Sequence, residues 1–146
     1  MSRKTTILIV DDDPDLRKLL RLALDNGMRK IHEVDTALGG LHMARDTLPD
    51  ILLLDIGLPG NFDGFTLCEA LAREPALRHV KVVIISGHNA SEDLERAERL
   101  GVDAYLVKPL SPNTLVELVE QLETPSQGMR VVAADPGPAD PADQAA

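Results

Sequence analysis

The chain has 146 residues, which is enough for one domain to bury an apolar core without disulfides or metal staples. Its formal net charge of −9 gives no general attraction to phosphate backbones and argues against nucleic-acid binding. The single cysteine, Cys68, excludes an internal disulfide and a cysteine-based zinc site. The sequence has no apolar stretch of transmembrane length and no signal-peptide core at 1–6, so we expect a soluble cytoplasmic protein with no membrane partner.

The first third of the chain alternates strand and helix signals. The apolar run at 7–10 predicts a strand, and the aspartates and proline that follow it end that strand sharply. Asp13 is a good N-cap, and leucines and alanines then recur at helical spacing up to Leu24, which predicts a helix. A weaker strand signal at 31–35 is followed by a helix signal at 38–48.

The middle of the chain carries two strongly apolar strands. The runs at 51–55 and 80–85 are continuous and rich in Leu, Ile and Val, which is typical of strands buried on both faces. Between them a loop with glycines and a proline leads to a helix predicted at 64–73. A charged, amphipathic helix is predicted at 90–100, and Gly101 is a natural left-handed cap for it.

The last third predicts a short strand at 104–107 and a helix that ends near Leu122. Strands and helices therefore alternate five times with short connections. This pattern predicts an α/β fold, a doubly wound five-stranded parallel sheet with helices on both faces, formed by residues 1–124. The segment 125–146 is low in complexity and rich in Ala, Pro and Asp, which predicts a disordered acidic tail.

Polar residues stand where the predicted strands end. Asp11 and Asp12 follow the first strand, Asp55 ends the third, Ser86 follows the fourth and Lys108 follows the fifth. In a parallel sheet these ends share one edge, which is where ligands bind. Several nearby carboxylates repel one another and need a counter-charge. Mg²⁺, a hard cation that prefers oxygen ligands, together with the ammonium group would supply it.

These residues lie in segments that resemble the receiver domain of two-component response regulators, of the stand-alone single-domain type. The resemblance covers roughly residues 4–123 and is carried by ILIVDDDP at 7–14, DILLLDIGLP at 50–59 followed by Asp63-Gly64, VIISG at 83–87 and AYLVKP at 104–109. Any one of these segments is a weak signal, but all of them in order at strand ends are a strong one. The resemblance implies the flavodoxin-like receiver fold.

The resemblance also implies roles at the acidic edge. Asp55 would be the nucleophile and phosphate acceptor. Asp12 would bind Mg²⁺ directly, Asp11 would hold the ion through water, and Gly57 would add its backbone carbonyl. An aspartate can take a phosphoryl group as an acyl phosphate, and positioning with charge neutralisation is most of what phosphoryl transfer needs.

The resemblance further implies a switch beside this edge. Ser86 and Lys108 would each contact a phosphoryl oxygen, and the peptide bond before Pro109 would be cis. Tyr105 would turn inward when Ser86 is pulled toward the phosphate. The phosphoryl donor would be a phosphohistidine on a histidine kinase or histidine phosphotransfer protein. Output would pass to a protein target through the face of the fourth helix, fifth strand and fifth helix.

Other readings remain open at this level. Three residues separate Pro59 from Asp63, one more than in the family, and this affects the loop beside Gly57. The chain could be a receiver-like interaction scaffold that takes no phosphate. It could instead be an aspartyl-phosphate phosphatase, although such enzymes usually carry a second Asp where Gly57 stands. We expect a switch rather than an enzyme. The sequence does not distinguish direct output to a protein target from phosphorelay shuttling or phosphate storage. Tyr105 could also be an ordinary half-buried aromatic residue of a strand.

Overall fold

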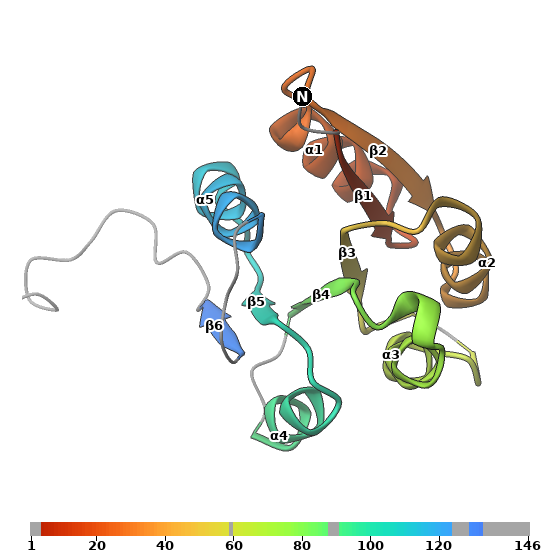
Figure 1. Ribbon diagram of the computed structural model, residues 1–146. Coiled ribbons are helices and arrows are strands. Elements are labelled where there is room, and N and C mark those ends of the chain that lie inside the picture. The colour runs from red at the N-terminus through yellow and green to blue at the C-terminus, as the bar shows by residue number, and fades with distance from the viewer. Residues whose placement is uncertain (1–3, 59, 88–90, 124–128, 133–146) are drawn as a thin grey trace, which may run out of the picture.

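A computed structural model describes residues 4–58, 60–87, 91–123 and 129–132. Within these residues strands and helices alternate along the chain (Figure 1). The strands are β1 (Thr5–Val10), β2 (Arg29–Val34), β3 (Ile51–Asp55), β4 (Lys81–Ser86), β5 (Ala104–Val107) and β6 (Arg130–Val132). The α-helices are α1 (Pro14–Leu24), α2 (Ala37–Thr47), α3 (Gly64–Arg73), α4 (Ser91–Arg99) and α5 (Pro112–Leu122), and a 3-10 turn, η1, spans Pro75–Leu77.

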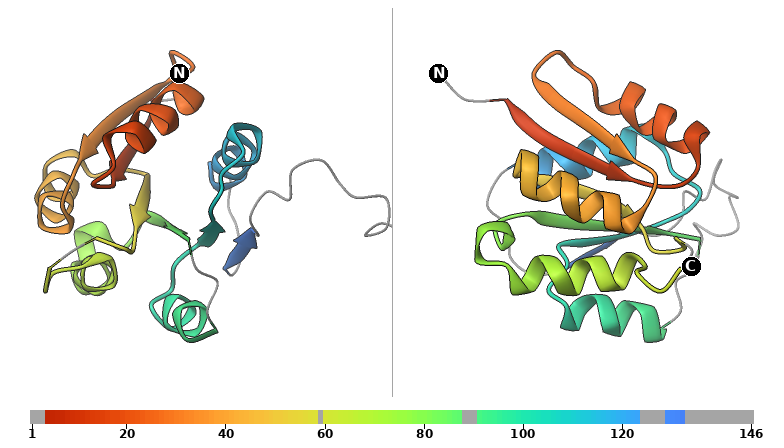
Figure 2. Two further views of the ribbon diagram at one scale, coloured as in Figure 1. Left: turned by 180° about the vertical axis from the view of Figure 1, so that it is seen from behind. Right: turned by 90° about the vertical axis from the view of Figure 1, so that its right-hand side faces the viewer.

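All strands of the described sheet are parallel, in the order β2-β1-β3-β4-β5-β6. Helices α1 and α5 cover one face, and α2, α3 and α4 cover the other (Figure 2). The doubly wound prediction is confirmed. The strand order reverses between β1 and β3, so the loops that follow these two strands diverge and leave a crevice at their carboxyl ends.

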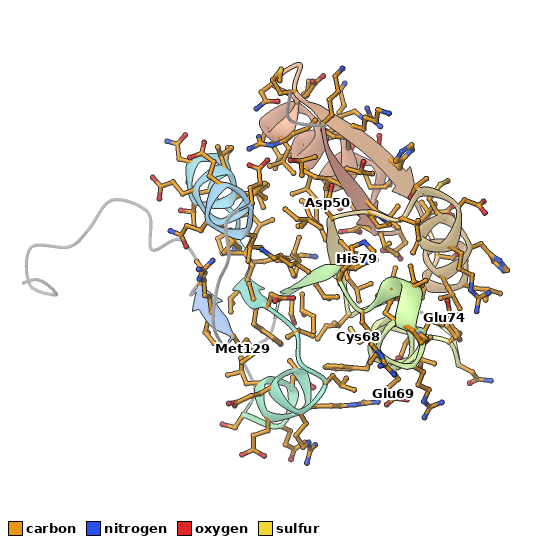
Figure 3. The ribbon with its side chains drawn as sticks, viewed as in Figure 1. Asp50, Cys68, Glu69, Glu74, His79 and Met129 are labelled. Carbon is orange, nitrogen blue, oxygen red and sulfur yellow. The ribbon has the colours of Figure 1, made fainter. Side chains whose placement is uncertain are left out.

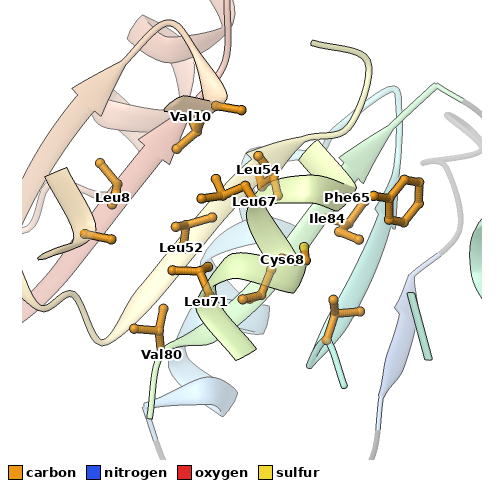
Figure 4. Packing of buried hydrophobic residues seen from close by; sticks show 14 of the residues in the cluster. Leu8, Val10, Leu52, Leu54, Phe65, Leu67, Cys68, Leu71, Val80 and Ile84 are labelled. Carbon is orange, nitrogen blue, oxygen red and sulfur yellow. The ribbon is translucent and has the colours of Figure 1, made fainter. Parts of the chain in front are cut away.

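The central strand β3 is buried on both faces, as its apolar sequence predicts. Leu52 and Leu54 belong to a cluster under α2, α3 and α4, whereas Leu53 belongs to a cluster under α1 and α5. In the first cluster α3 presents Leu67 and Leu71 to the sheet (Figure 4). This burial holds β3, and hence the residue at its end, in a fixed position. In the described part of the chain, helices long and apolar enough to cross a membrane are absent.

The sheet has one strand more than the five that the sequence predicted. Arg130–Val132 pairs with β5 and lies inside the segment 125–146 that was assigned to a disordered tail. The sequence does not predict β6, because two adjacent valines are a weak strand signal within a low-complexity segment. Their partner, the edge of β5, is created only by the folded sheet. Apart from 129–132, the predicted tail lies outside the described residues.

Glu123 fastens the end of α5 to the far edge of the sheet. Its carboxylate accepts hydrogen bonds from Arg29 Nη2 at 2.6 Å and from the Thr5 hydroxyl at 2.7 Å. The Arg29 side chain is only 5% exposed. Partial burial raises the pKa of Glu123, but these two hydrogen bonds and the charge of Arg29 outweigh it and leave the pKa below its usual value.

The substitution Glu123→Gln is expected to lower the free energy of unfolding by about 1–2 kcal/mol at neutral pH, because it leaves a buried guanidinium without its anion. The pKa of Glu123 is lower in the folded protein than in the unfolded chain. The stabilisation by Glu123 is therefore complete above the pKa of the unfolded chain and is lost as the pH falls through the pKa of the folded protein. The difference from wild type should therefore shrink as the pH falls below about 4. Urea titrations at both pH values test this, with Glu120→Gln, an exposed carboxylate on the same helix, as the control. An equal loss in both variants would contradict it.

Candidate functional site

The loop after β1 places two carboxylates at the carboxyl end of the sheet. Asp11 is 1% exposed, and its Oδ1 accepts a hydrogen bond from the backbone N–H of Asp13 at 2.8 Å. Asp12 is exposed. Asp13 is the N-cap of α1, with its side chain accepting from Asp15 N at 2.9 Å, so the third aspartate is a cap as predicted.

Asp55 lies at the end of β3, one strand away from Asp11. Its side chain is largely buried, and Oδ1 accepts a hydrogen bond from the backbone N–H of Gly57 at 2.8 Å. The start of α3 presses against the same strand end. A Cβ on Gly64 would lie 2.8 Å from the Ile56 Cα, so only glycine allows this approach.

Strands β4 and β5 bring the remaining two predicted residues to the same edge. Lys108 Nζ lies 3.5 Å from Asp55 Oδ2. The Lys108 backbone N–H donates to the carbonyl of Ser86 at 2.8 Å, which ties the two strand ends together. The peptide bond between Lys108 and Pro109 is cis, as the resemblance implied.

Asp11, Asp12 and Asp55 converge on one point. They offer one carboxylate oxygen each, and these atoms lie within 4.8 Å of one another. Burial raises the pKa of Asp11 to about 6; its hydrogen bond from Asp13 opposes the rise, and the negative charge of Asp55 adds to it. Asp11 Oδ2 is buried and has no hydrogen-bond partner among the described residues. A buried carboxylate oxygen without a donor, beside two further carboxylates, fits a divalent cation with oxygen ligands.

The acidic edge opens into a cleft of about 470 Å³. Its lining includes Asp55, Gly57, Ser86 and Lys108, so four of the predicted site residues share one solvent-accessible space. This volume is within the range of small-molecule sites and leaves room for a phosphoryl group to approach Asp55 from outside.

Tyr105 lies inside the protein next to this cleft. Its side chain is fully buried, in the cluster under α2, α3 and α4. Burial raises the pKa of Tyr105, a hydrogen bond with the Ser86 side chain lowers it, and the negative charge of Asp93 raises it. The structure thus connects Tyr105 to Ser86 directly.

A second cation, which the sequence does not predict, lies in the cleft. Arg96, on α4, lines it together with Phe65 of α3. The guanidinium carbon lies 4.3 Å from the centre of the Phe65 ring, and Nη2 lies 3.6 Å from Glu69 Oε1. Nothing in the spacing of these residues predicts the contact, because it depends on how α3 and α4 pack.

The lengthened loop is described only in part. Pro59 lies outside the described residues. Past Pro59, Phe62 packs against the cluster under α2, α3 and α4, and Asp63 caps α3 by accepting from Thr66 N at 3.0 Å. Phe62 and Asp63 thus lie against the folded core.

Comparison with known proteins agrees with this geometry. The sequence model of the response regulator receiver domain matches residues 7–120. The chain is 34% identical over 115 residues to an uncharacterised 14.6 kDa protein in the sodA1 3' region of Leptolyngbya boryana, covering 79% of this chain and 87% of that protein. It is 38% identical over 119 residues to the response regulator PleD of Caulobacter vibrioides, covering 80% of this chain but 25% of PleD.

A solved structure supports the same assignment. The CheY-like response regulator receiver domain protein of Methanospirillum hungatei is 28% identical and superimposes with a TM-score of 0.75, covering 82% of this chain and 94% of that one. The sheet order, the acidic edge and the family match over residues 7–120 all support a receiver domain. The chain belongs to the response regulator receiver domain family of two-component systems.

Proposed function

We propose that this receiver domain accepts a phosphoryl group on Asp55 and signals by contact with other proteins. The observation that carries the proposal is that the Asp11, Asp12 and Asp55 carboxylates meet at one point, and that Asp55 also faces Lys108 across an open cleft. An Asp55 oxygen attacks the phosphorus of a phosphohistidine, the phosphorus–nitrogen bond breaks, and an acyl phosphate forms on Asp55. The histidine leaves with the electron pair of that bond.

Asp11, Asp12 and Asp55, with the backbone carbonyl of Gly57, would hold Mg²⁺ beside the acceptor. When bound, the ion would neutralise charge on the carboxylates and on the phosphoryl oxygens. Burial disfavours the charged form of Asp11, which raises its pKa. A bound cation would stabilise this buried charge.

Lys108 and Ser86 complete the acceptor site in this proposal. Lys108 faces Asp55 Oδ2 and would pair with a phosphoryl oxygen as charge develops there. Ser86 would donate its hydroxyl to a second oxygen. Because Ser86 also bonds to Tyr105, a change at Ser86 alters the surroundings of the buried ring and can shift the packing of β5.

The proposed partners follow from the family. A histidine kinase or histidine phosphotransfer protein in the cytoplasm supplies the phosphoryl group, and a protein target reads the face formed by α4, β5 and α5. The same site catalyses gain and loss of the group, so the chain acts as a switch and not as an enzyme on separate substrates. The similarity to the response regulator PleD supports this assignment.

The direct test is the intact mass of the protein after incubation with Mg²⁺ and acetyl phosphate. One added phosphoryl group that is lost on standing, and that EDTA prevents, would support the proposal. An unchanged mass both with acetyl phosphate and with a phosphorylated histidine phosphotransfer protein as donor would favour the interaction scaffold instead.

Gly57 is predicted to shorten the lifetime of the phosphoryl group. A Cβ placed there would lie 3.2 Å from Asp55 Oδ1, so the missing side chain leaves an open approach to the acceptor. Gly57→Asn and Gly57→Arg should each slow the hydrolysis of the acyl phosphate several-fold, because their side chains obstruct water. The half-life after removal of acetyl phosphate measures this. Faster hydrolysis in both variants than in wild type would contradict it.

A further inference from the structure

Arg17 reaches from α1 to the loop that carries the acidic edge. Its Nη1 donates a hydrogen bond to the backbone carbonyl of Asp11 at 2.7 Å. This carbonyl belongs to the peptide between Asp11 and Asp12, whose carboxylates meet that of Asp55. The Arg17 side chain is 20% exposed, so the bond is partly shielded from water. A guanidinium has no acceptor atom and cannot itself bind a cation, so Arg17 is connected to the site through the main chain.

Glu33 of β2, the outer strand of the sheet, holds the guanidinium of Arg17 from the other side. Arg17 Nε lies 3.4 Å from Glu33 Oε1. Glu33 Oε2 accepts from Nε of Arg21, one helical turn further along α1, and Arg21 Nη2 donates to the carbonyl of Ile31 at 2.9 Å. Figure 3 shows α1 beside β2, with the side chains of both elements drawn. Glu33 is thus held by two cations, and it anchors Arg17 in turn.

Two further hydrogen bonds hold the same turn at its ends. The backbone N–H of Asp11 donates to the carbonyl of Val34 at 3.1 Å, and Asp11 Oδ1 accepts from the Asp13 N–H at 2.8 Å. The bond from Arg17 acts between them, on the peptide plane itself. A rotation of this plane changes ψ of Asp11 and φ of Asp12, and so moves the two carboxylates relative to each other.

We propose that Arg17, anchored by Glu33, is a positioning residue for the acidic edge. It holds the peptide between Asp11 and Asp12 in the orientation in which their carboxylates meet that of Asp55. The inference rests on the proposed Mg²⁺ site and extends it to residues of α1 and β2 that lie outside the acceptor cleft. Groups that orient the ligands of a metal ion commonly change its affinity by about 10- to 100-fold.

The charge of Arg17 and its positioning role act on Mg²⁺ binding in opposite directions. A nearby guanidinium repels a bound cation, so removal of the charge alone should tighten Mg²⁺ binding. Loss of the bond to the Asp11 carbonyl frees the peptide and should weaken Mg²⁺ binding. The sign of the change in affinity therefore separates the two effects.

The test is a Mg²⁺ titration of the full chain without a phosphoryl donor, followed by the NMR amide shifts of Asp12 and Asp13. Arg17→Met keeps an unbranched apolar stem of similar length and removes the charge and the donors. It should raise the dissociation constant for Mg²⁺ by about tenfold. Arg17→Lys keeps the charge and a donor but not the planar fork, and should restore part of the affinity.

Arg21→Met is the matched control. It removes the same charge from the same helix and breaks a pair with the same carboxylate, but the main-chain contact that it loses is with Ile31 and not with Asp11. The dissociation constant for Mg²⁺ should stay close to that of wild type or fall. Urea titrations in EDTA compare the free energies of unfolding of the two variants, so a general loss of stability can be separated from a loss of Mg²⁺ affinity.

Glu33→Gln tests the anchor. In the wild-type background this change should weaken Mg²⁺ binding several-fold, because Arg17 loses the anion that holds it. In the Arg17→Met background it should have little further effect, since the residue through which Glu33 acts is gone. An equal effect in both backgrounds would contradict the anchoring role, because Glu33 would then act by its charge alone.

Amide hydrogen exchange at Asp13 in EDTA gives a readout that needs no metal. The Asp13 N–H donates to Asp11 Oδ1, so its protection reports whether the turn keeps its shape. Exchange should be faster in Arg17→Met than in wild type and in Arg21→Met. If wild type did not bind Mg²⁺, the proposed Mg²⁺-dependent function would fail, and this exchange would still decide the role of Arg17.

Three results would overturn the proposal. The first is an unchanged or lower dissociation constant in Arg17→Met, which would show that Arg17 acts by its charge or has no effect on the site. The second is an equal increase in Arg21→Met, since a general loosening of α1 would then explain both variants. The third is unchanged exchange at Asp13 in Arg17→Met, because the turn would then keep its shape without the bond.

Discussion

The substitution Asp55→Asn is expected to reduce phosphoryl incorporation from acetyl phosphate by at least about 100-fold, to below detection. An asparagine side chain keeps the size of aspartate and can still accept the Gly57 N–H bond, but it is a poor nucleophile and offers no charge to Lys108. Intact mass after incubation with Mg²⁺ and acetyl phosphate measures the effect.

The control for Asp55→Asn is Asp63→Asn. Asp63 also lines the cleft, and asparagine keeps its role as the N-cap of α3. This variant should gain the phosphoryl group as wild type does. If Asp55→Asn still gains a phosphoryl group while Asp63→Asn does not, the acceptor has been assigned to the wrong side of the cleft.

The substitution Asp11→Asn is expected to stabilise the protein in EDTA at neutral pH by up to about 3 kcal/mol, since each pKa unit corresponds to about 1.4 kcal/mol. The pKa of Asp11 is raised from 3.8 to about 6, mainly by burial, so the folded state holds this charge at a disadvantage. The destabilisation by the Asp11 charge grows as the pH rises from 3.8 to about 6 and is complete above that pH. Near pH 4, where Asp11 is largely protonated in the folded protein, the variant should gain much less. Urea titrations at the two pH values test the prediction.

In Mg²⁺, unlike in EDTA, wild type should be more stable than Asp11→Asn. Wild type should gain stability on addition of Mg²⁺ because the ion binds the folded state only, and Asp11→Asn should gain much less. Asp25→Asn, at an exposed position beyond α1, should match wild type in both respects. Asparagine can still accept the hydrogen bond from the Asp13 N–H, so a loss of stability in Asp11→Asn in EDTA would contradict the claim that the buried charge is unfavourable.

The sequence by itself determined the architecture and the residues of the acidic edge. Local patterns were sufficient for this, because apolar runs identify the strands and apolar residues at helical spacing identify the helices. The alternation of these elements then forces a parallel sheet, whose strand ends share an edge. Asp55 and Lys108 could thus be placed together although they lie 53 positions apart in the sequence. The resemblance added the cis bond before Pro109 and the pairing of roles.

Only the tertiary structure decided the remaining features. The sixth strand depends on an edge that exists once β5 is in the sheet, and two adjacent valines carry too little pattern to predict it. The contact of Arg96 with Phe65 depends on how two helices pack, which no local spacing encodes. The raised pKa of Asp11 depends on burial and on charges from distant parts of the chain. Each of these features depends on contacts between residues that are far apart in the sequence. A sequence pattern can predict that such residues lie near one another, but not how strongly they interact.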